Sequence, residues 1–108
     1  MSSDKLNNDK HEFLPPWHLT DTDLTIQLKR EISRDHILYG KDLKTIARRH
    51  DNDDALFQIF NSDFEYAKVH LTWSQKPIKD SYWPATETFK DWQEAYENLI
   101  VPDSKDWE

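Results

Sequence analysis

The chain has 108 residues, with 14 lysines and arginines against 21 aspartates and glutamates, and a formal net charge of −7. It contains no cysteine, which excludes disulfide scaffolds, thiol chemistry and cysteine-ligated zinc and suits a reducing, cytoplasmic setting. No stretch of 18 apolar residues occurs, so the sequence predicts neither a membrane-spanning helix nor a secretory signal. The length fits one domain, and five Trp, four Tyr and five Phe favour a folded core over disorder.

The N-terminal segment divides into a polar part and an apolar part. Residues 1–13 are polar and charged without periodicity, which predicts a mobile lead-in. Residues 13–17, Phe-Leu-Pro-Pro-Trp, predict an extended arm that lies across the core, because a residue that precedes proline is pushed away from helical backbone angles.

A first helix is predicted to end near Asp35, with Thr20 or Thr22 as its cap. Its buried stripe consists of apolar residues at spacings of four, which are Leu24, Leu28 and Ile32. The one glycine of the chain, Gly40, marks the tightest turn that follows this helix.

Three strands are predicted next, at residues 43–49, 55–60 and 64–73, because each run is bounded by turn-forming residues. The third run alternates most clearly, and its apolar face consists of Ala67, Val69, Leu71 and Trp73. The short connections favour an antiparallel meander, since parallel pairing needs long crossovers.

A second helix is predicted to start at a cap on Thr88 or Thr86 and to end at Val101 and Pro102. Its apolar side is formed by Phe89, Trp92, Tyr96, Leu99 and Ile100. We therefore expect a single α+β domain over residues 14–102, built as helix, three-stranded antiparallel meander, helix. Both helices should lie on one face of the sheet, and residues 103–108 should form a frayed tail.

The acidic residues are concentrated in the second half of the chain. Residues 1–50 hold nine basic and eight acidic side chains, whereas residues 51–108 hold five basic and thirteen acidic ones. Such a field attracts basic protein surfaces and repels phosphate backbones, so it favours a cationic protein partner over nucleic acid or a membrane. A surface that only keeps a small domain soluble has the same charge pattern.

The sequence contains one candidate metal site and one candidate catalytic site. The run Asp51 to Asp54 resembles the start of a calcium loop, but the twelfth position is Ser62 where a bidentate glutamate is needed, so no metal or cofactor is predicted. His70, His36 and Arg48 could form a small phosphodiesterase-type site if the fold brought them together. No glycine-rich phosphate loop accompanies them.

The motifs Asp-His-Ile-Leu-Tyr-Gly at residues 35–40, Ile-Ala-Arg-Arg at 46–49, Asp-Asp-Ala-Leu-Phe at 53–57 and Val-His-Leu-Thr-Trp at 69–73 resemble a group of short bacterial proteins of undetermined role. By size, acidity, absence of cysteine and aromatic content, the chain is also similar in type to bacterial immunity proteins, including those of contact-dependent growth inhibition. That second resemblance implies a cytoplasmic, non-enzymatic inhibitor of a toxin.

The resulting hypothesis is an immunity protein that neutralises a basic toxin domain, such as a nuclease, through an acidic surface. The residues expected to contact the toxin are Asp53, Asp54, Glu87, Asp91, Glu94 and Glu97. The alternatives are the small enzyme already described and a non-catalytic adaptor that associates with itself.

Overall fold

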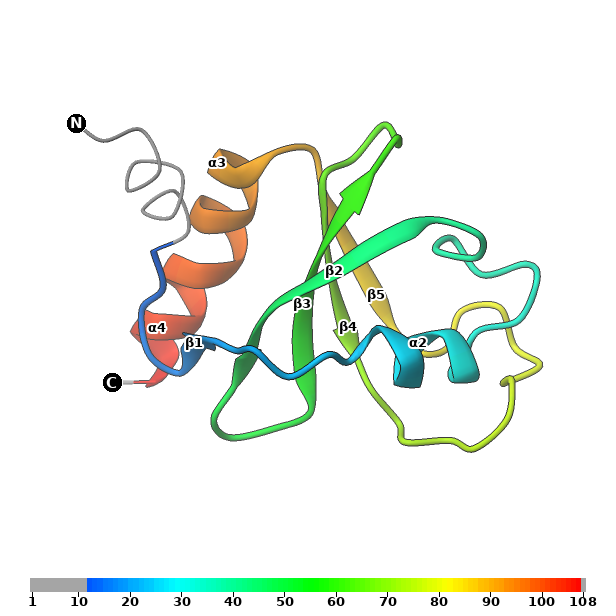
Figure 1. Ribbon diagram of the computed structural model, residues 1–108. Coiled ribbons are helices and arrows are strands. Elements are labelled where there is room, and N and C mark those ends of the chain that lie inside the picture. Colours follow the sequence, from blue (N-terminus) through cyan, green and yellow to red (C-terminus); the bar gives the residue numbers. More distant parts are fainter. Residues whose placement is uncertain (1–11, 108) are drawn as a thin grey trace.

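A computed structural model describes residues 12–107 and shows a five-stranded antiparallel sheet in which every strand pairs with the next one along the chain (Figure 1). The strands are β1 (Trp17–Leu19), β2 (Asp42–Arg49), β3 (Asp54–Phe60), β4 (Tyr66–His70) and β5 (Thr86–Phe89). Helix α2 (Thr25–Glu31) connects β1 to β2. A C-terminal helix follows β5 and consists of α3 (Trp92–Ala95), the π-helical turn η1 (Tyr96–Ile100) and α4 (Val101–Trp107). Most of the predicted lead-in, residues 1–11, lies outside the described residues.

The α+β content agrees with the sequence prediction, but the three-stranded meander is wrong because the sheet has five strands. The three predicted strands correspond to β2, β3 and β4, but the third ends at His70, and Trp73, which was predicted on its apolar face, lies beyond the strand and is exposed. The missed strands are the two edges. Strand β1 has only three residues, so it shows too little alternation to be distinguished from an extended arm. Strand β5 contains Thr86 and Thr88, which are equally suited to cap a helix and to form an edge strand.

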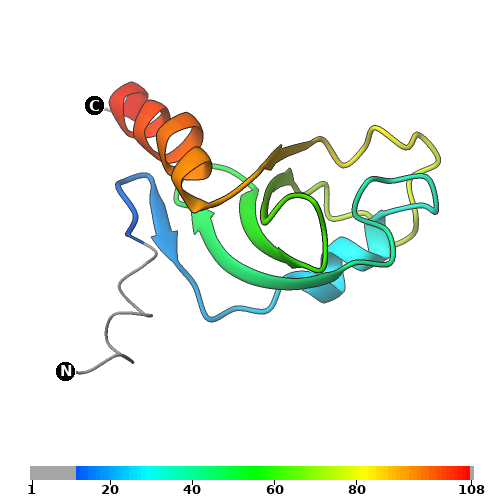
Figure 2. The same cartoon turned by 90° about the horizontal axis from the view of Figure 1, so that it is seen from above.

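The two helices lie on opposite faces of the sheet, which corrects the prediction that both cover one face (Figure 2). Strand β3 explains this arrangement, because it is apolar on both sides and so needs a cover on each face. The core beneath α2 consists of Leu24, Leu28, Ile32, Leu38, Ala55, Phe57, Ile59, Ala67, Val69 and Leu71. The core beneath the C-terminal helix consists of Trp17, Ile46, Ala47, Leu56, Tyr66, Phe89, Ala95, Leu99 and Ile100.

The C-terminal helix is displaced along the sequence from its predicted position. It begins at Trp92 with Asp91 as the cap, rather than at Thr88 or Thr86, because the preceding residues belong to β5. It also continues through Pro102 to Trp107, so the predicted stop and frayed tail are wrong over residues 103–107. In the π-helical turn, the Val101 N–H donates to the Tyr96 carbonyl five residues back. This wider turn lies immediately before Pro102, which has no N–H to donate.

The predicted turn at Gly40 is present, with a φ of 76° in the left-handed region that glycine tolerates best. The first helix is shorter than predicted, and Leu24 rather than a threonine is at its N-cap position. The Leu24 N–H donates instead to the Thr45 hydroxyl in β2, over 2.9 Å. This bond fixes the start of α2 against the sheet.

Tyr66 gives the fold a measurable dependence on alkaline pH. Its side chain is fully buried, and burial, together with the negative charges of Glu65 and Asp91, raises the pKa of the phenol to about 12. A raised pKa in the folded state contributes stability that is present below the unfolded value of 10.0 and is lost as the pH rises towards about 12. The free energy of unfolding should therefore fall between about pH 10 and about pH 12. Urea denaturation monitored by tryptophan fluorescence measures it.

The Tyr66→Phe variant is the control for this prediction, because phenylalanine keeps the ring and removes the ionisable group. Its free energy of unfolding should fall less over the same pH interval. Equal losses in the two proteins would assign the alkaline sensitivity to other groups.

Candidate functional site

The acidic residues predicted to bind a partner lie at two opposite ends of the sheet (Figure 1). Asp53 and Asp54 are in the turn from β2 to β3 and at the start of β3. Asp91, Glu94 and Glu97 lie at the beginning of the C-terminal helix. The six predicted residues therefore do not form one continuous surface.

Asp54 is buried and paired with a histidine, so it is not a free carboxylate. Its side chain is 7% exposed, and its Oδ1 lies 2.7 Å from Nδ1 of His70 on the neighbouring strand β4. Asp53, the residue before it, is exposed. At this end of the sheet, Asp53 therefore presents its carboxylate to solvent, whereas Asp54 does not.

Asp91 and Glu94 form the cap of the C-terminal helix. The Glu94 N–H donates to Oδ1 of Asp91 over 2.9 Å, and the Lys90 N–H donates to Oε1 of Glu94 over 2.7 Å. This is a capping box in which the glutamate accepts from the residue before the cap. The Asp-x-x-Glu spacing at residues 91–94 fits this helix start better than the threonines that were predicted as caps.

Glu65 is an acidic neighbour that sequence reasoning missed. Its backbone N–H donates to the carbonyls of Phe89 and Lys90, over 3.1 and 3.2 Å, which places the turn before β4 beside the start of the C-terminal helix. Its carboxylate and that of Asp91 both raise the pKa of Tyr66, after the larger effect of burial. We call the group Glu65, Asp91, Glu94 and Glu97 the acidic end.

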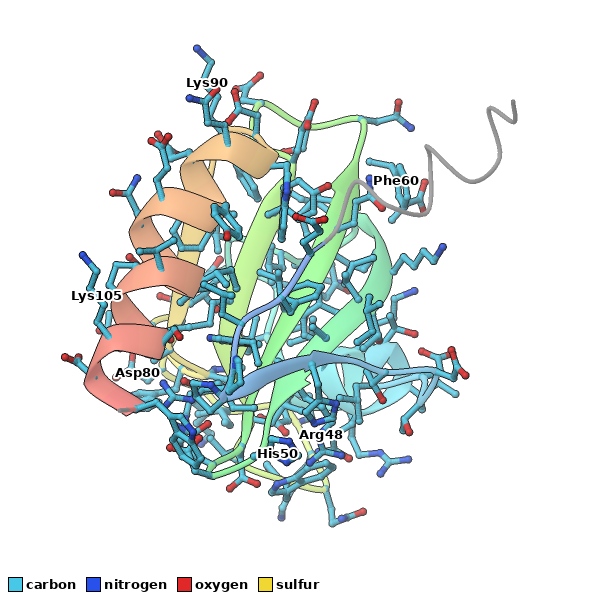
Figure 3. The ribbon with its side chains drawn as sticks, turned by 90° about the vertical axis from the view of Figure 1, so that its left-hand side faces the viewer. Arg48, His50, Phe60, Asp80, Lys90 and Lys105 are labelled. Carbon is cyan, nitrogen blue, oxygen red and sulfur yellow. The ribbon has the colours of Figure 1, made fainter. Side chains whose placement is uncertain are left out.

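Three of the four carboxylates of the acidic end are exposed. These are Glu65, Glu94 and Glu97, and Glu97 accepts a hydrogen bond from Nε2 of Gln93 one turn earlier, over 3.2 Å. Lys90 lies at the same end of the molecule (Figure 3). The cap and the helix hold Glu94 and Glu97 on a rigid element, so little ordering entropy opposes their contact with a partner.

Glu87 lies apart from the acidic end and faces a lysine. Its Oε1 is 3.6 Å from Nζ of Lys68, its cross-strand neighbour in β4. Both residues line a shallow hollow of about 300 Å³ that also includes His70 and Tyr82. The lysine partly offsets the negative charge that Glu87 would offer to a cationic partner.

The residues of the alternative enzyme site are separated by the sheet. His70 lies beside Asp54, whereas Arg48 pairs with Ala55, a member of the core beneath α2, so the two side chains lie on opposite faces. His36 is buried, with Nε2 3.0 Å from the Pro84 carbonyl and Nδ1 accepting the Leu38 N–H over 3.1 Å. Both of its ring nitrogens have structural partners. These three residues do not converge on one reacting centre.

Within residues 12–107, no group of three or more histidine, aspartate or glutamate side chains could hold a metal ion. In the same part of the chain, no helix is long and apolar enough to cross a membrane. The chain matches no known protein family, no curated protein and no solved structure.

Proposed function

We propose that this chain is a cytoplasmic immunity protein that neutralises a basic toxin domain, such as a nuclease, by covering its active site with the acidic end. The observation that supports the proposal is that carboxylates from two chain segments gather there. Glu65 comes from the turn before β4, and Asp91, Glu94 and Glu97 come from the helix start.

A toxin that cleaves nucleic acid must present lysine and arginine side chains to bind phosphates. Exposed carboxylates can accept charge-assisted hydrogen bonds from the same cations, so they compete with the substrate for the same surface. Opposite charge also accelerates the encounter, and this effect weakens as salt screens the charges. The proposed complex is therefore salt-sensitive.

The proposal is tested with the double variant Glu94→Lys and Glu97→Lys. Reversing these two charges should weaken binding to the toxin domain encoded beside this gene by about 10- to 100-fold and abolish protection of cells that express that domain. Isothermal titration calorimetry at low and high salt measures the affinity, and circular dichroism verifies that the variant is folded.

The matched control is the double variant Asp21→Lys and Asp35→Lys. It makes the same change in net charge at two exposed positions that flank α2, away from the acidic end. Protection that is lost only in the first variant supports the proposal. If both variants bind like the native chain, or if both lose affinity equally, the acidic end is not the contact surface. A neighbouring gene that encodes no toxin also contradicts the proposal.

A further inference from the structure

An open polar hollow of about 610 Å³ lies where β1, the segment after it and the turn after β2 meet. His18, Arg48 and His50 line it, together with the side chains of Thr20, Thr22 and Asp53. Figure 3 shows Arg48 and His50 near each other at the end of the sheet opposite Lys90. No residue of the acidic end or of the two hydrophobic cores lines this hollow.

Arg48 and Arg49 both line the hollow, but only the charge of Arg49 is countered by carboxylates. Arg49 donates two hydrogen bonds of 2.8 Å to the carboxylate of Asp51 and one of 3.1 Å to Asp103, so its charge is countered within the fold. Arg48 lies opposite His18 in the β1–β2 ladder. Within the described part of the chain, it has no carboxylate within 4.0 Å. The guanidinium of Arg48 is therefore a partly buried cation that can bind an added anion.

Two histidines line the hollow beside Arg48. The ring centroids of His18 and His50 are 4.5 Å apart, and the ring planes are tilted by 39°. Nδ1 of His18 lies 3.0 Å from the Leu19 carbonyl, which can only accept, so this nitrogen carries the hydrogen.

The carboxylates that line the hollow do not neutralise Arg48. Asp51 lines it, but the hydrogen bonds from Arg49 hold the pKa of that carboxyl below its usual value and occupy both of its oxygens. Asp53 is exposed and is the remaining negative group on the lining. No oxygen of Asp53 lies within 4.0 Å of the guanidinium of Arg48, so this cation is available to an added anion.

We propose that this hollow binds a phosphate group through the unpaired guanidinium of Arg48, beside the rings of His18 and His50. A guanidinium binds phosphate oxygens with two parallel N–H donors. Thr20 and Thr22, whose hydroxyls can donate hydrogen bonds, also line the hollow. This site goes beyond the proposed function, since it lies at the end of the sheet away from the acidic end.

The phosphate could be free or could be part of an ester. A second hollow of about 340 Å³ shares His18 and His50 with the first and is also lined by Phe13, Pro15 and Leu19. An aromatic phosphate ester could place its ring there, whereas inorganic phosphate would occupy the first hollow alone. Binding of inorganic phosphate and of phenyl phosphate distinguishes the two sources, because only the second ligand would shift the amide resonance of Phe13.

The experiment titrates the full chain with inorganic phosphate and follows amide resonances by nuclear magnetic resonance. Saturable shifts should appear around His18, Thr20 and His50. Arg48→Ala should weaken binding by at least about 10-fold, and Arg48→Lys should do so less, because lysine keeps the charge but loses the fork of donors.

One further variant makes the result decisive. Lys44→Ala removes an exposed cation from the same strand but outside the hollow, and its phosphate affinity should equal that of the native chain. The proposal is overturned if the native chain shows no saturable shifts, or if Arg48→Ala and Lys44→Ala change the affinity equally.

Discussion

Replacing Glu31 with alanine should lower the free energy of unfolding by about 3–5 kcal/mol. The Glu31 side chain is 0% exposed, and its carboxylate accepts four hydrogen bonds. Oε1 accepts from the N–H and the hydroxyl of Thr72, over 3.0 and 2.8 Å. Oε2 accepts from the Trp73 N–H and from Nε2 of Gln27, each over 2.8 Å. Alanine would remove the fully buried carboxylate that accepts from all four of these donors.

The loss should spread to the segment between β4 and β5, because Glu31 attaches that segment to α2. Its backbone carbonyl also accepts the Ile78 N–H over 2.8 Å. Trp73 has a φ of 63°, a conformation that is uncommon for a bulky side chain, and the hydrogen bond to Glu31 helps to hold it. Hydrogen exchange at Trp73 and Ile78 should therefore accelerate more than exchange in β3.

Urea denaturation measures the change in stability, and Glu31→Gln is the informative comparison. Glutamine keeps the length of the side chain, but it replaces one acceptor oxygen with an NH₂ group that faces existing donors. It should be destabilised, by less than the alanine variant. A Glu31→Ala protein within about 1 kcal/mol of the native chain would show that the four bonds contribute little net stability.

The parts of the fold that could be predicted are those with a local period. The stripe of Leu24, Leu28 and Ile32 identified α2, and the alternation around Val69 identified β4, because burial on one side imposes these spacings. Edge strands β1 and β5 were missed because short segments with one paired side carry little periodic signal. The side on which each helix packs could not be predicted from helix periodicity, since it depends on both faces of the central strand.

The grouping of the acidic residues was also predictable only in part. Asp91, Glu94 and Glu97 could be grouped from the sequence because helical spacing places them within two turns. The sequence could not show that Asp53 lies far from these three residues, since the distance between the β2–β3 turn and the helix start depends on strand register. Glu31 did carry a signal, because it follows Leu28 by three positions on the buried side of α2. A charged residue at such a position indicates a buried polar network.

Replacing Asp103 with alanine should lower the free energy of unfolding by about 2–3 kcal/mol. Oδ2 of Asp103 accepts the indole N–H of Trp17 over 2.9 Å and lies 3.1 Å from Nη1 of Arg49. Trp17 is 2% exposed, so its N–H would be left buried without this acceptor. Arg49 would keep its bonds to Asp51, which limits the loss.

The reason for this effect is that Asp103 attaches the last turns of the C-terminal helix to β1 and β2 at once. Burial lowers the pKa of Arg49, but the hydrogen bond with Asp51 and the negative charge of Asp103 raise it by more, so the guanidinium stays charged and holds both carboxylates. The matched control is Asp106→Ala, an exposed residue of the same helix, which should change stability by less than about 0.5 kcal/mol. Thermal and urea unfolding measure both variants. If they lose equal stability, helix propensity alone explains why residues 103–107 are helical, and the contact with Trp17 does not fasten the helix.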